Sequence, residues 1–459
     1  MKRIAIAFVL VVLTGLLSIQ SAQALQFVWD NLGTDYNTAI NWTPDTIPSG
    51  SNVAVFDTPA TVQPNLSLSV SVAGLFFRDT DSGGYTITNT GGAAFTLTGT
   101  STSGAGGTAN GSAAAIRSET TATVNQINAP LILAPASGGT QSTFFQASNG
   151  LLFVSGAVSG AGINLSLRGG GSILLSAANS HATTSIDAAN TTLILGNDGA
   201  LGAGTFSINS TATVQTTGGN RTVANAVVFG GNTTISGTNA ITFNGDVRSS
   251  GSSSRAVNVT NTGGATFNGS VFLEEAGAPA GRIFTLGGSQ IVTINGVVQD
   301  GSAQPAGLRY NGTSTLTLAN TNTYSGGTLL GGGTTIVTQN GGLGTGNVSL
   351  TAAAVTLTLQ GAVNNYISDT ANLNIQFTDD IVNLNYSGTD TISSLTIAGV
   401  QEAPGIYGSA ASGAPNVRPE LFGTGTLTVL TMIPEPATYM LFGLGVLVCA
   451  QQFRRKKAK

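Results

Sequence analysis

The chain of 459 residues is poor in the side chains that carry out most chemistry in proteins. It has one Cys, one His and only 16 cationic and 20 acidic residues, so that charge makes up 8% of the chain against a usual value of about 25%. A single Cys excludes an intrachain disulfide and a cysteine-based zinc site. The Gly runs also lack the Gly-x-x-x-x-Gly-Lys-Ser/Thr pattern of a nucleotide loop. We therefore predict no bound metal and no cofactor.

Lysine is absent from the long middle of the chain. The four Lys residues are Lys2, Lys456, Lys457 and Lys459. Between Leu25 and Ile433 there are nine Arg and 19 acidic residues, which gives a net charge of 9 − 19 = −10. Phosphate backbones are bound by clustered Lys and Arg, so the composition argues against nucleic acid as a partner.

The segment 1–24 has the three parts of a secretory signal peptide. Lys2 and Arg3 supply the positive start, an apolar run broken only by Thr14 and Gly15 extends to Leu17, and Ala22-Gln23-Ala24 has the small residues of a cleavage site. Ala22 and Ala24 are the predicted cleavage-site residues, and the Sec export machinery is the predicted partner. A membrane anchor is the alternative, which the shortness of the apolar run disfavours.

The other end of the chain has three short features in a fixed order. Pro434-Glu435-Pro436 is followed by the apolar segment Ala437–Phe453 and then by Arg454-Arg455-Lys456-Lys457. A helix of this apolar segment would be about 26 Å long, close to the ~30 Å core of a bilayer, so we predict one transmembrane helix. The basic cluster is expected on the cytoplasmic side, which places the middle of the chain outside the inner membrane.

Residues 433–459 resemble the PEP-CTERM sorting signal of Gram-negative bacteria that produce exopolysaccharide. The resemblance implies that an exosortase-type membrane protease recognises Pro434, Glu435 and Pro436 and cleaves near them. The helix would then be a temporary anchor, and the protein would be released or attached at the cell surface. A permanent single-span anchor is the alternative.

Between its two ends the chain has the pattern of short β-strands. Apolar and polar residues alternate in segments such as Thr315–Leu318 and Val355–Leu359, which is typical of half-buried strands. Asn-Gly pairs, each of which marks a tight turn, begin at Asn110, Asn149, Asn244, Asn268, Asn295, Asn311 and Asn340. No segment in the middle of the chain has the pattern of a helix.

An internal repeat narrows the choice among all-β folds. Residues 178–208 align with residues 321–350 when one residue is skipped near Gly199. The alignment pairs Asn179 with Asn322, His181 with Tyr324, Thr191-Thr192 with Thr334-Thr335, and Leu201 with Leu343. A unit of about 30 residues that recurs imperfectly is typical of a solenoid.

The second copy resembles the autotransporter-associated β-strand repeat. The matching positions in residues 318–350 are Asn322, Thr323, Tyr324, Gly326, Gly327, Thr328, Leu343, Gly344 and Gly346. The first copy departs from the pattern, because residues 181–184 replace its Tyr-x-Gly-Gly core. The resemblance implies a right-handed parallel β-helix displayed outside the cell.

We accordingly expect one long solenoid with two removable ends. Its parts are a signal peptide (1–24), an N-terminal β cap (25–100), a solenoid (101–393), a closing β segment (394–432) and the sorting signal (433–459). Roughly 400 mature residues at about 20–25 per coil predict 16–20 coils stacked about 4.8 Å apart.

Few residues are candidates for chemistry. Any catalytic triad would depend on His181, which we interpret as a turn residue because Tyr324 takes its place in the other copy. Asp379 and Asp380 are adjacent and should point to opposite faces of a strand. Asp198 lies in a segment faintly like a calcium-binding repeat, but it does not recur at a nine-residue period. We predict no catalytic residue.

Two classes of function remain. The first is an exported, non-enzymatic surface or matrix protein with polar faces that adhere to surfaces or lie along exopolysaccharide. The alternative is a β-helix enzyme that cleaves polysaccharides, with Asp379 or Asp369 acting together with Asp390 as acid and base.

Overall fold

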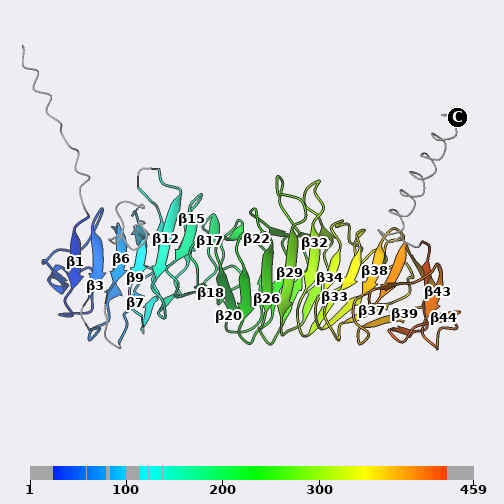
Figure 1. Ribbon diagram of the computed structural model, residues 1–459. Coiled ribbons are helices and arrows are strands. Elements are labelled where there is room, and N and C mark those ends of the chain that lie inside the picture. The colour runs from blue at the N-terminus through cyan, green and yellow to red at the C-terminus, as the bar shows by residue number, and fades with distance from the viewer. Residues whose placement is uncertain are drawn as a thin grey trace, which may run out of the picture.

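The computed structural model describes residues 24–57, 59–78, 83–99, 114–121, 123–136 and 138–431. These residues form a long rod of about 15 turns of parallel β-strand (Figure 1), in which the one helix described is the short 3-10 segment η1 (Ala39–Asn41). The predicted all-β parallel solenoid is therefore confirmed, while its right-handed sense stays a prediction. The predicted signal peptide, except for Ala24, and the C-terminal helix lie outside the described residues.

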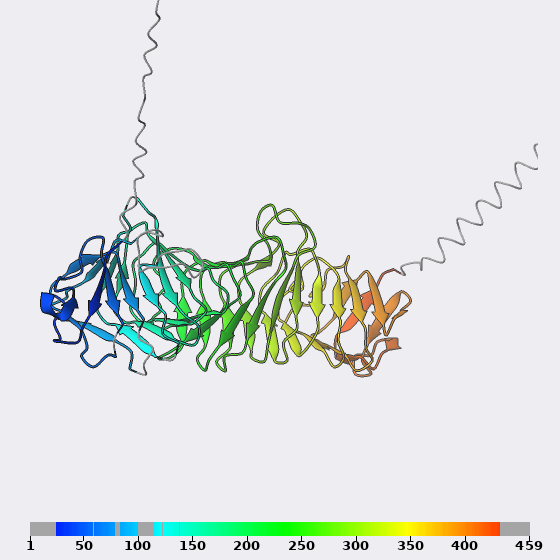
Figure 2. The same cartoon turned by 60° about the vertical axis from the view of Figure 1, so that its left-hand side comes forward.

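The rod has three long faces, and on each face successive turns add parallel strands. The first face has thirteen strands and runs from β2 (Trp42–Thr43) and β1 (Gln26–Trp29) to β31 (Val298–Gln299). The second face has sixteen strands and runs from β4 (Asn65–Leu66) to β42 (Val400–Gln401). At the ends of these sheets, β1 with β2 and β41 (Ser394–Ile397) with β42 form antiparallel pairs. The rod is elongated in both views of the ribbon (Figure 2).

The third face is divided into two sheets. Its N-terminal sheet has four strands: β5 (Val70–Val72), β8 (Phe95–Leu97), β11 (Leu131–Leu133) and β14 (Val158–Ser159). Its C-terminal sheet has nine strands: β21 (Arg221–Val223), β24 (Ile241–Phe243), β27 (Ala265–Phe267), β30 (Val292–Ile294), β33 (Thr315–Leu318), β35 (Thr334–Val337), β37 (Thr356–Gln360), β39 (Ile381–Asn385) and β45 (Leu421–Gly423). Between the two sheets, irregular corners take the place of strands.

The turns are fewer than the 16–20 expected, because they differ in length along the rod. In the regular part of the rod, Leu193 pairs with Val214 on the next turn. Near the N-terminus, however, Ile87 pairs with Ile127, so that one turn there takes nearly twice as much chain. Loops between strands lengthen such turns without adding strands to the sheets. The chain therefore completes about 15 turns, fewer than a uniform turn length would give.

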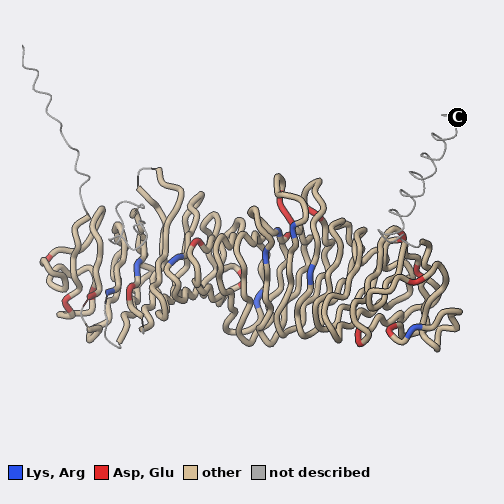
Figure 3. Tube along the Cα trace, in the orientation of Figure 1, with Lys and Arg blue, Asp and Glu red and all other residues tan. Residues whose placement is uncertain are grey.

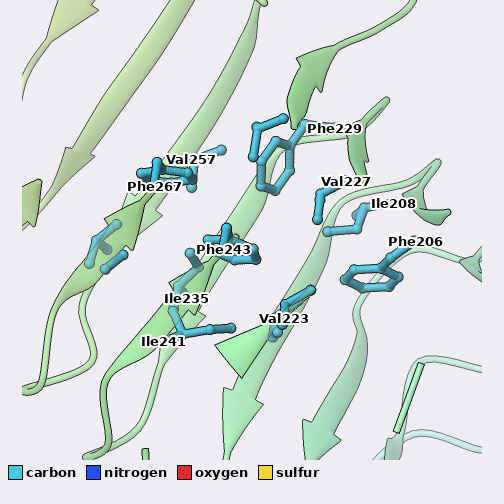
Figure 4. Packing of buried hydrophobic residues seen from close by; sticks show 14 of the residues in the cluster. Phe206, Ile208, Val223, Val227, Phe229, Ile235, Ile241, Phe243, Val257 and Phe267 are labelled. Atoms are coloured by element: carbon cyan, nitrogen blue, oxygen red, sulfur yellow. The ribbon is translucent and has the colours of Figure 1, made fainter. Parts of the chain in front are cut away.

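The core is a set of apolar stacks between the three faces. Strands of the third face alternate buried and half-buried residues, so each contributes apolar side chains to the interior. Phe243 and Phe267 stack with ring centroids 5.1 Å apart and planes 14° apart (Figure 4). The same register position is filled by Val223 on the turn before and by Ile294 and Leu318 on the turns after, and burying each such side chain contributes about 1.5–3 kcal/mol.

Antiparallel pairs close both ends of the rod. At the N-terminal end, β2 pairs antiparallel with β1, and the rings of Trp29 and Trp42 meet edge to face at 5.1 Å. At the C-terminal end, β43 (Gly405–Gly408) pairs antiparallel with β46 (Thr426–Val429). These pairs cover strand edges that would otherwise be free to bind another chain.

Candidate functional site

The two sequence repeats form the same hydrogen-bonded corner. In the first copy, His181 Nε2 lies 2.7 Å from Thr184 Oγ1, which donates to the carbonyl of Leu201 at 2.9 Å. In the second copy, Tyr324 Oη lies 2.5 Å from Thr328 Oγ1, which donates to the carbonyl of Leu343 at 3.0 Å. The ring is buried in both copies.

An Asn side chain fastens each corner to the turns on either side. Asn179 accepts from the backbone N–H of Val158 at 2.7 Å and donates to the carbonyl of Ala200 at 2.7 Å. Asn322 accepts from Val298 at 2.7 Å and donates to Gly342 at 2.6 Å. The repeat detected in the sequence is therefore a repeat of hydrogen bonding.

The structure corrects the alignment inside the repeat. Thr191 and Thr335 are both fully buried, whereas Thr192 and Thr334 are half-buried, so the buried pair is Thr191 with Thr335. The extra residue of the second copy lies between Tyr324 and Thr328, which are four positions apart where His181 and Thr184 are three. The sequence alignment matched Thr191 with Thr334 because both copies contain Thr-Thr. That alignment is displaced by one residue from the structural match.

The buried imidazole has the environment of a packing residue. Burial lowers the pKa of His181 to about 4, although a hydrogen bond with the Val158 backbone opposes the shift. The ring is therefore neutral at neutral pH and bonds to Thr184 inside the corner. This geometry agrees with its interpretation as a turn residue.

The candidate acidic residues have different surroundings. Asp379 is exposed, while Asp380 is buried and accepts backbone N–H bonds from Val355 at 3.0 Å and Phe377 at 3.2 Å. Both residues lie in the turn between β38 (Asn372–Ile375) and β39 (Ile381–Asn385), so the expectation that they face opposite sides of a strand is wrong, although one is exposed and the other buried. Asp369 is exposed.

Asp390, on β40 (Thr389–Ile392), is the most perturbed of the candidate acids. Its Oδ2 accepts from the backbone N–H groups of Tyr366 at 2.9 Å and Ile367 at 3.1 Å. Burial raises the pKa of Asp390 to about 7 in spite of these bonds, and the nearby Asp369 raises it further. Its Oδ1 is buried and has no hydrogen-bond partner among the described residues. Here two acids of the alternative catalytic hypothesis, Asp369 and Asp390, lie near each other.

The side chain of Asp198 bonds to the backbone of β21, the edge strand of the nine-stranded sheet. Its Oδ1 accepts from the backbone N–H of Thr222 at 3.0 Å. Within the part of the chain that the structure describes, no three His, Cys, Asp or Glu side chains are grouped as a metal site would require.

Sequence reasoning missed a buried charged cluster in the loops beside β29 (Ile283–Gly288). Figure 3 shows acidic and basic segments together in the loops that project there. The guanidinium of Arg282 donates to Ser249 Oγ at 2.8 Å and to the Ser253 carbonyl at 2.9 Å, and Glu274 accepts from Ser302. Both charged side chains are buried, so the cluster ties three loops together. The signal was the concentration of Arg and Glu within a few turns of a solenoid that carries few charges elsewhere.

Of the predicted sorting and cleavage residues, the structure describes Ala24, which packs against an apolar cluster of the first face that includes Val53 and Phe76. The others lie outside the described residues: Ala22, Pro434, Glu435, Pro436, Arg454, Arg455, Lys456 and Lys457. Among the residues that are described, no helix is long and apolar enough to cross a membrane.

Comparison with known families bears on the C-terminal end. A family model described as the PEP-CTERM protein-sorting motif matches residues 433–456. The chain carries a PEP-CTERM sorting motif. In PEP-CTERM proteins this motif indicates export and processing by an exosortase, a membrane protease. Searches of curated proteins and of solved structures found no significant match to the chain, and the likeness of residues 318–350 to the autotransporter-associated repeat stays a prediction.

Proposed function

We propose that the protein is an exported, non-enzymatic surface or matrix protein, a rigid β-solenoid sorted through its PEP-CTERM motif. The observation that carries this proposal is the joining of a rod of about 15 turns to a sorting motif at residues 433–456. In the proposed pathway, Sec exports the chain, the segment after Pro434-Glu435-Pro436 anchors it in the inner membrane, and exosortase cleaves near the triplet. The rod is then displayed in adhesion or in association with exopolysaccharide.

The chemistry of the rod supports a structural role. Asp380 and the Oδ2 atom of Asp390 accept hydrogen bonds from backbone N–H groups, and the one imidazole is neutral inside a corner. A polysaccharide-cleaving site would need an acid and a base facing a bound sugar. Asp369 and Asp390 are the candidate acid and base of that alternative.

Mass spectrometry of the exported protein tests the sorting proposal. We expect the mature C-terminus to lie near Pro434–Pro436 and to lack Arg454–Lys459. A mature chain that retains the basic tail would show that exosortase does not process it and would favour the permanent anchor.

An activity screen tests the non-enzymatic proposal. The purified protein should release no reducing ends or unsaturated sugars from neutral and acidic polysaccharides. Turnover of a polysaccharide that disappears in Asp369→Asn or in Asp379→Asn would make the protein an enzyme, because both residues are exposed and neither substitution should unfold the rod.

A further inference from the structure

The C-terminal sheet of the third face carries an unbroken row of threonines. Thr222, Thr242, Thr266, Thr293 and Thr317 pair in sequence across five adjacent strands, β21, β24, β27, β30 and β33. All five are half-buried and point outward, since the residues that flank them on β24, β27, β30 and β33 are buried, as is Val223 on β21. The row therefore places one hydroxyl and one methyl group on every rung.

A second row runs beside the first. Asn244, Asn268 and Asn295 follow the threonines by two residues, so they share the outward face, and all three are exposed. Their amides are chained together: Asn268 Nδ2 donates to Asn244 Oδ1 at 2.8 Å, and Asn295 Nδ2 donates to Asn268 Oδ1 at 2.9 Å. The three turns thus repeat the pattern Thr-x-Asn-Gly, which we call the Thr-Asn array.

The array is held rigidly from beneath and at its margin. The residue between Thr and Asn is buried in each turn, and two of these residues are the stacked rings of Phe243 and Phe267 (Figure 4). Each Asn is followed by Gly, where a Cβ would come within 2.3 Å of a backbone oxygen at Gly245 or Gly269. Glycine lets consecutive turns approach closely here, which fixes the spacing of the rows.

The threonine hydroxyls are available to a ligand. Within the described part of the chain, none of the five Thr side chains makes a hydrogen bond, whereas Thr260 and Thr262 nearby donate to backbone carbonyls at 3.0 and 2.8 Å. Neither row contains a charged side chain. Asp246, which lies just beyond Asn244, accepts from the backbone N–H of Ser270 at the margin of the array.

A ligand for such a surface must be uncharged, extended and periodic. Rungs of a parallel sheet repeat about every 4.8 Å, close to the repeat of water oxygens along the surface of an ice crystal. Threonine is restricted at χ1 by its branched β-carbon, so the hydroxyls hold fixed positions before the ligand arrives, which lowers the entropic cost of binding. The alternating methyl and hydroxyl groups suit a lattice of water better than they suit a charged polymer.

We infer that the Thr-Asn array is an ice-binding face. Thr222 to Thr317 and Asn244 to Asn295 would align with rows of water molecules on the crystal and adsorb to it along several rungs at once. A polysaccharide chain fits the array less well, because sugar rings are commonly held by exposed aromatic side chains and neither row contains one. This inference does not depend on the sorting proposal.

Inhibition of ice recrystallisation by the purified protein tests the inference. We expect the wild-type protein to inhibit crystal growth and to be enriched in ice during slow freezing. Thr266→Tyr, in the centre of the row, should raise the concentration needed by roughly tenfold or more, and Thr293→Lys should do the same by adding a charge to the face.

The matched control is Thr213→Tyr. Thr213 is also half-buried and points outward between Thr192 and Thr234, but it lies on the second face, in a shorter row. The Thr213→Tyr variant should inhibit ice recrystallisation as well as the wild type does. Circular dichroism should show the same β content for all variants. No inhibition by the wild-type protein, or equal inhibition by wild type and Thr266→Tyr, overturns the inference. Retention on an insoluble neutral polysaccharide, lost in Thr266→Tyr and without any effect on ice, would assign the face to polysaccharide instead.

Discussion

The imidazole of His181 and the phenol of Tyr324 occupy the same place in two copies of one corner, although the copies lie on different sides of the rod. The first corner leads into β17 (Thr183–Ile186) of the first face, and the second leads into β34 (Thr328–Leu330) of the second face. Each ring bonds to a buried threonine that in turn bonds to a leucine carbonyl. The corner is thus a unit that can replace a strand on either side of the solenoid.

Tyr324 should stabilise its corner mainly by filling space. We expect Tyr324→Phe to cost about 1 kcal/mol, the net value of one hydrogen bond, because Thr328 keeps its bond to Leu343. Tyr324→Ala should cost about 3–5 kcal/mol, since it leaves a cavity in the core. Urea unfolding of both variants measures the difference, and equal costs would show that the hydroxyl carries the contribution.

Gly344 and Gly413 have the same backbone conformation, so replacing each with alanine distinguishes backbone strain from a steric clash of the added methyl group. Gly344 has φ of +72°, and a Cβ there would lie 2.5 Å from the Tyr324 carbonyl; Gly413 has φ of +71° and open space around it. Gly413→Ala should cost about 1–2 kcal/mol for the left-handed conformation alone. Gly344→Ala should cost clearly more and lower the melting temperature further. Similar losses in the two variants would mean that the corner can relax around a methyl group.

The C-terminal part of the solenoid around Asp390 should become less stable as pH rises. The pKa of Asp390 is raised to about 7 from an ordinary value of 3.8, so its neutral form favours the fold. The stabilisation that the neutral Asp390 carboxyl gives the fold is fully present below pH 3.8 and is lost as pH rises through about 7. The free energy of unfolding should fall by at most about 4 kcal/mol over this range.

Hydrogen exchange at the amides of Tyr366 and Ile367, which donate to Asp390, measures this effect after correction for intrinsic rates. Protection should fall between pH 5 and pH 8 in the wild-type protein and in Asp379→Asn, but not in Asp390→Asn. The carboxyls of Asp187 and Glu402 act in the opposite sense, since hydrogen bonds hold their pKa values below the ordinary range despite burial. Protection that does not change with pH in the wild type would contradict the prediction.

Replacing Pro434, Glu435 and Pro436 by alanine should block sorting. The sorting proposal predicts that such a variant accumulates as a full-length chain in the membrane fraction, with its basic tail intact. Immunoblotting of cell fractions with an antibody to the rod measures this, and Asp379→Asn serves as a control that should be processed normally. Normal release of the alanine variant would remove the triplet from the recognition step.

Alternation of apolar and polar residues was sufficient to predict the strands, and the internal repeat was sufficient to predict a solenoid. The parallel arrangement of its strands followed from the resemblance to the autotransporter-associated repeat. The sequence also identified the sorting motif, whose three features are contiguous in the chain. Contacts between turns were harder to foresee. Asn179 and Asn322 could be matched, but their partners lie a full turn away along the chain and follow only from the length of each turn.

The same limit explains the two features that sequence reasoning missed. The Thr-Asn array emerges only when irregular turns are stacked, since the chain between Thr266 and Thr293 is longer than the chain between Thr242 and Thr266. No fixed period in the sequence reveals the row. The cluster of Arg282 and Glu274 likewise joins loops that come together only through the register of β25 (Val247–Ser249), β28 (Val271–Phe272) and β31.

The fastening of each corner to the turns directly before and after it has a consequence for how the rod changes in length. Asn322 reaches back to Val298 and forward to Gly342, and no further. A whole turn can therefore be duplicated or lost while the surfaces that meet remain complementary, because stability in such a stack is a sum of neighbouring contacts. Descendants of this gene can lengthen or shorten the rod in steps of about 4.8 Å without redesigning either end.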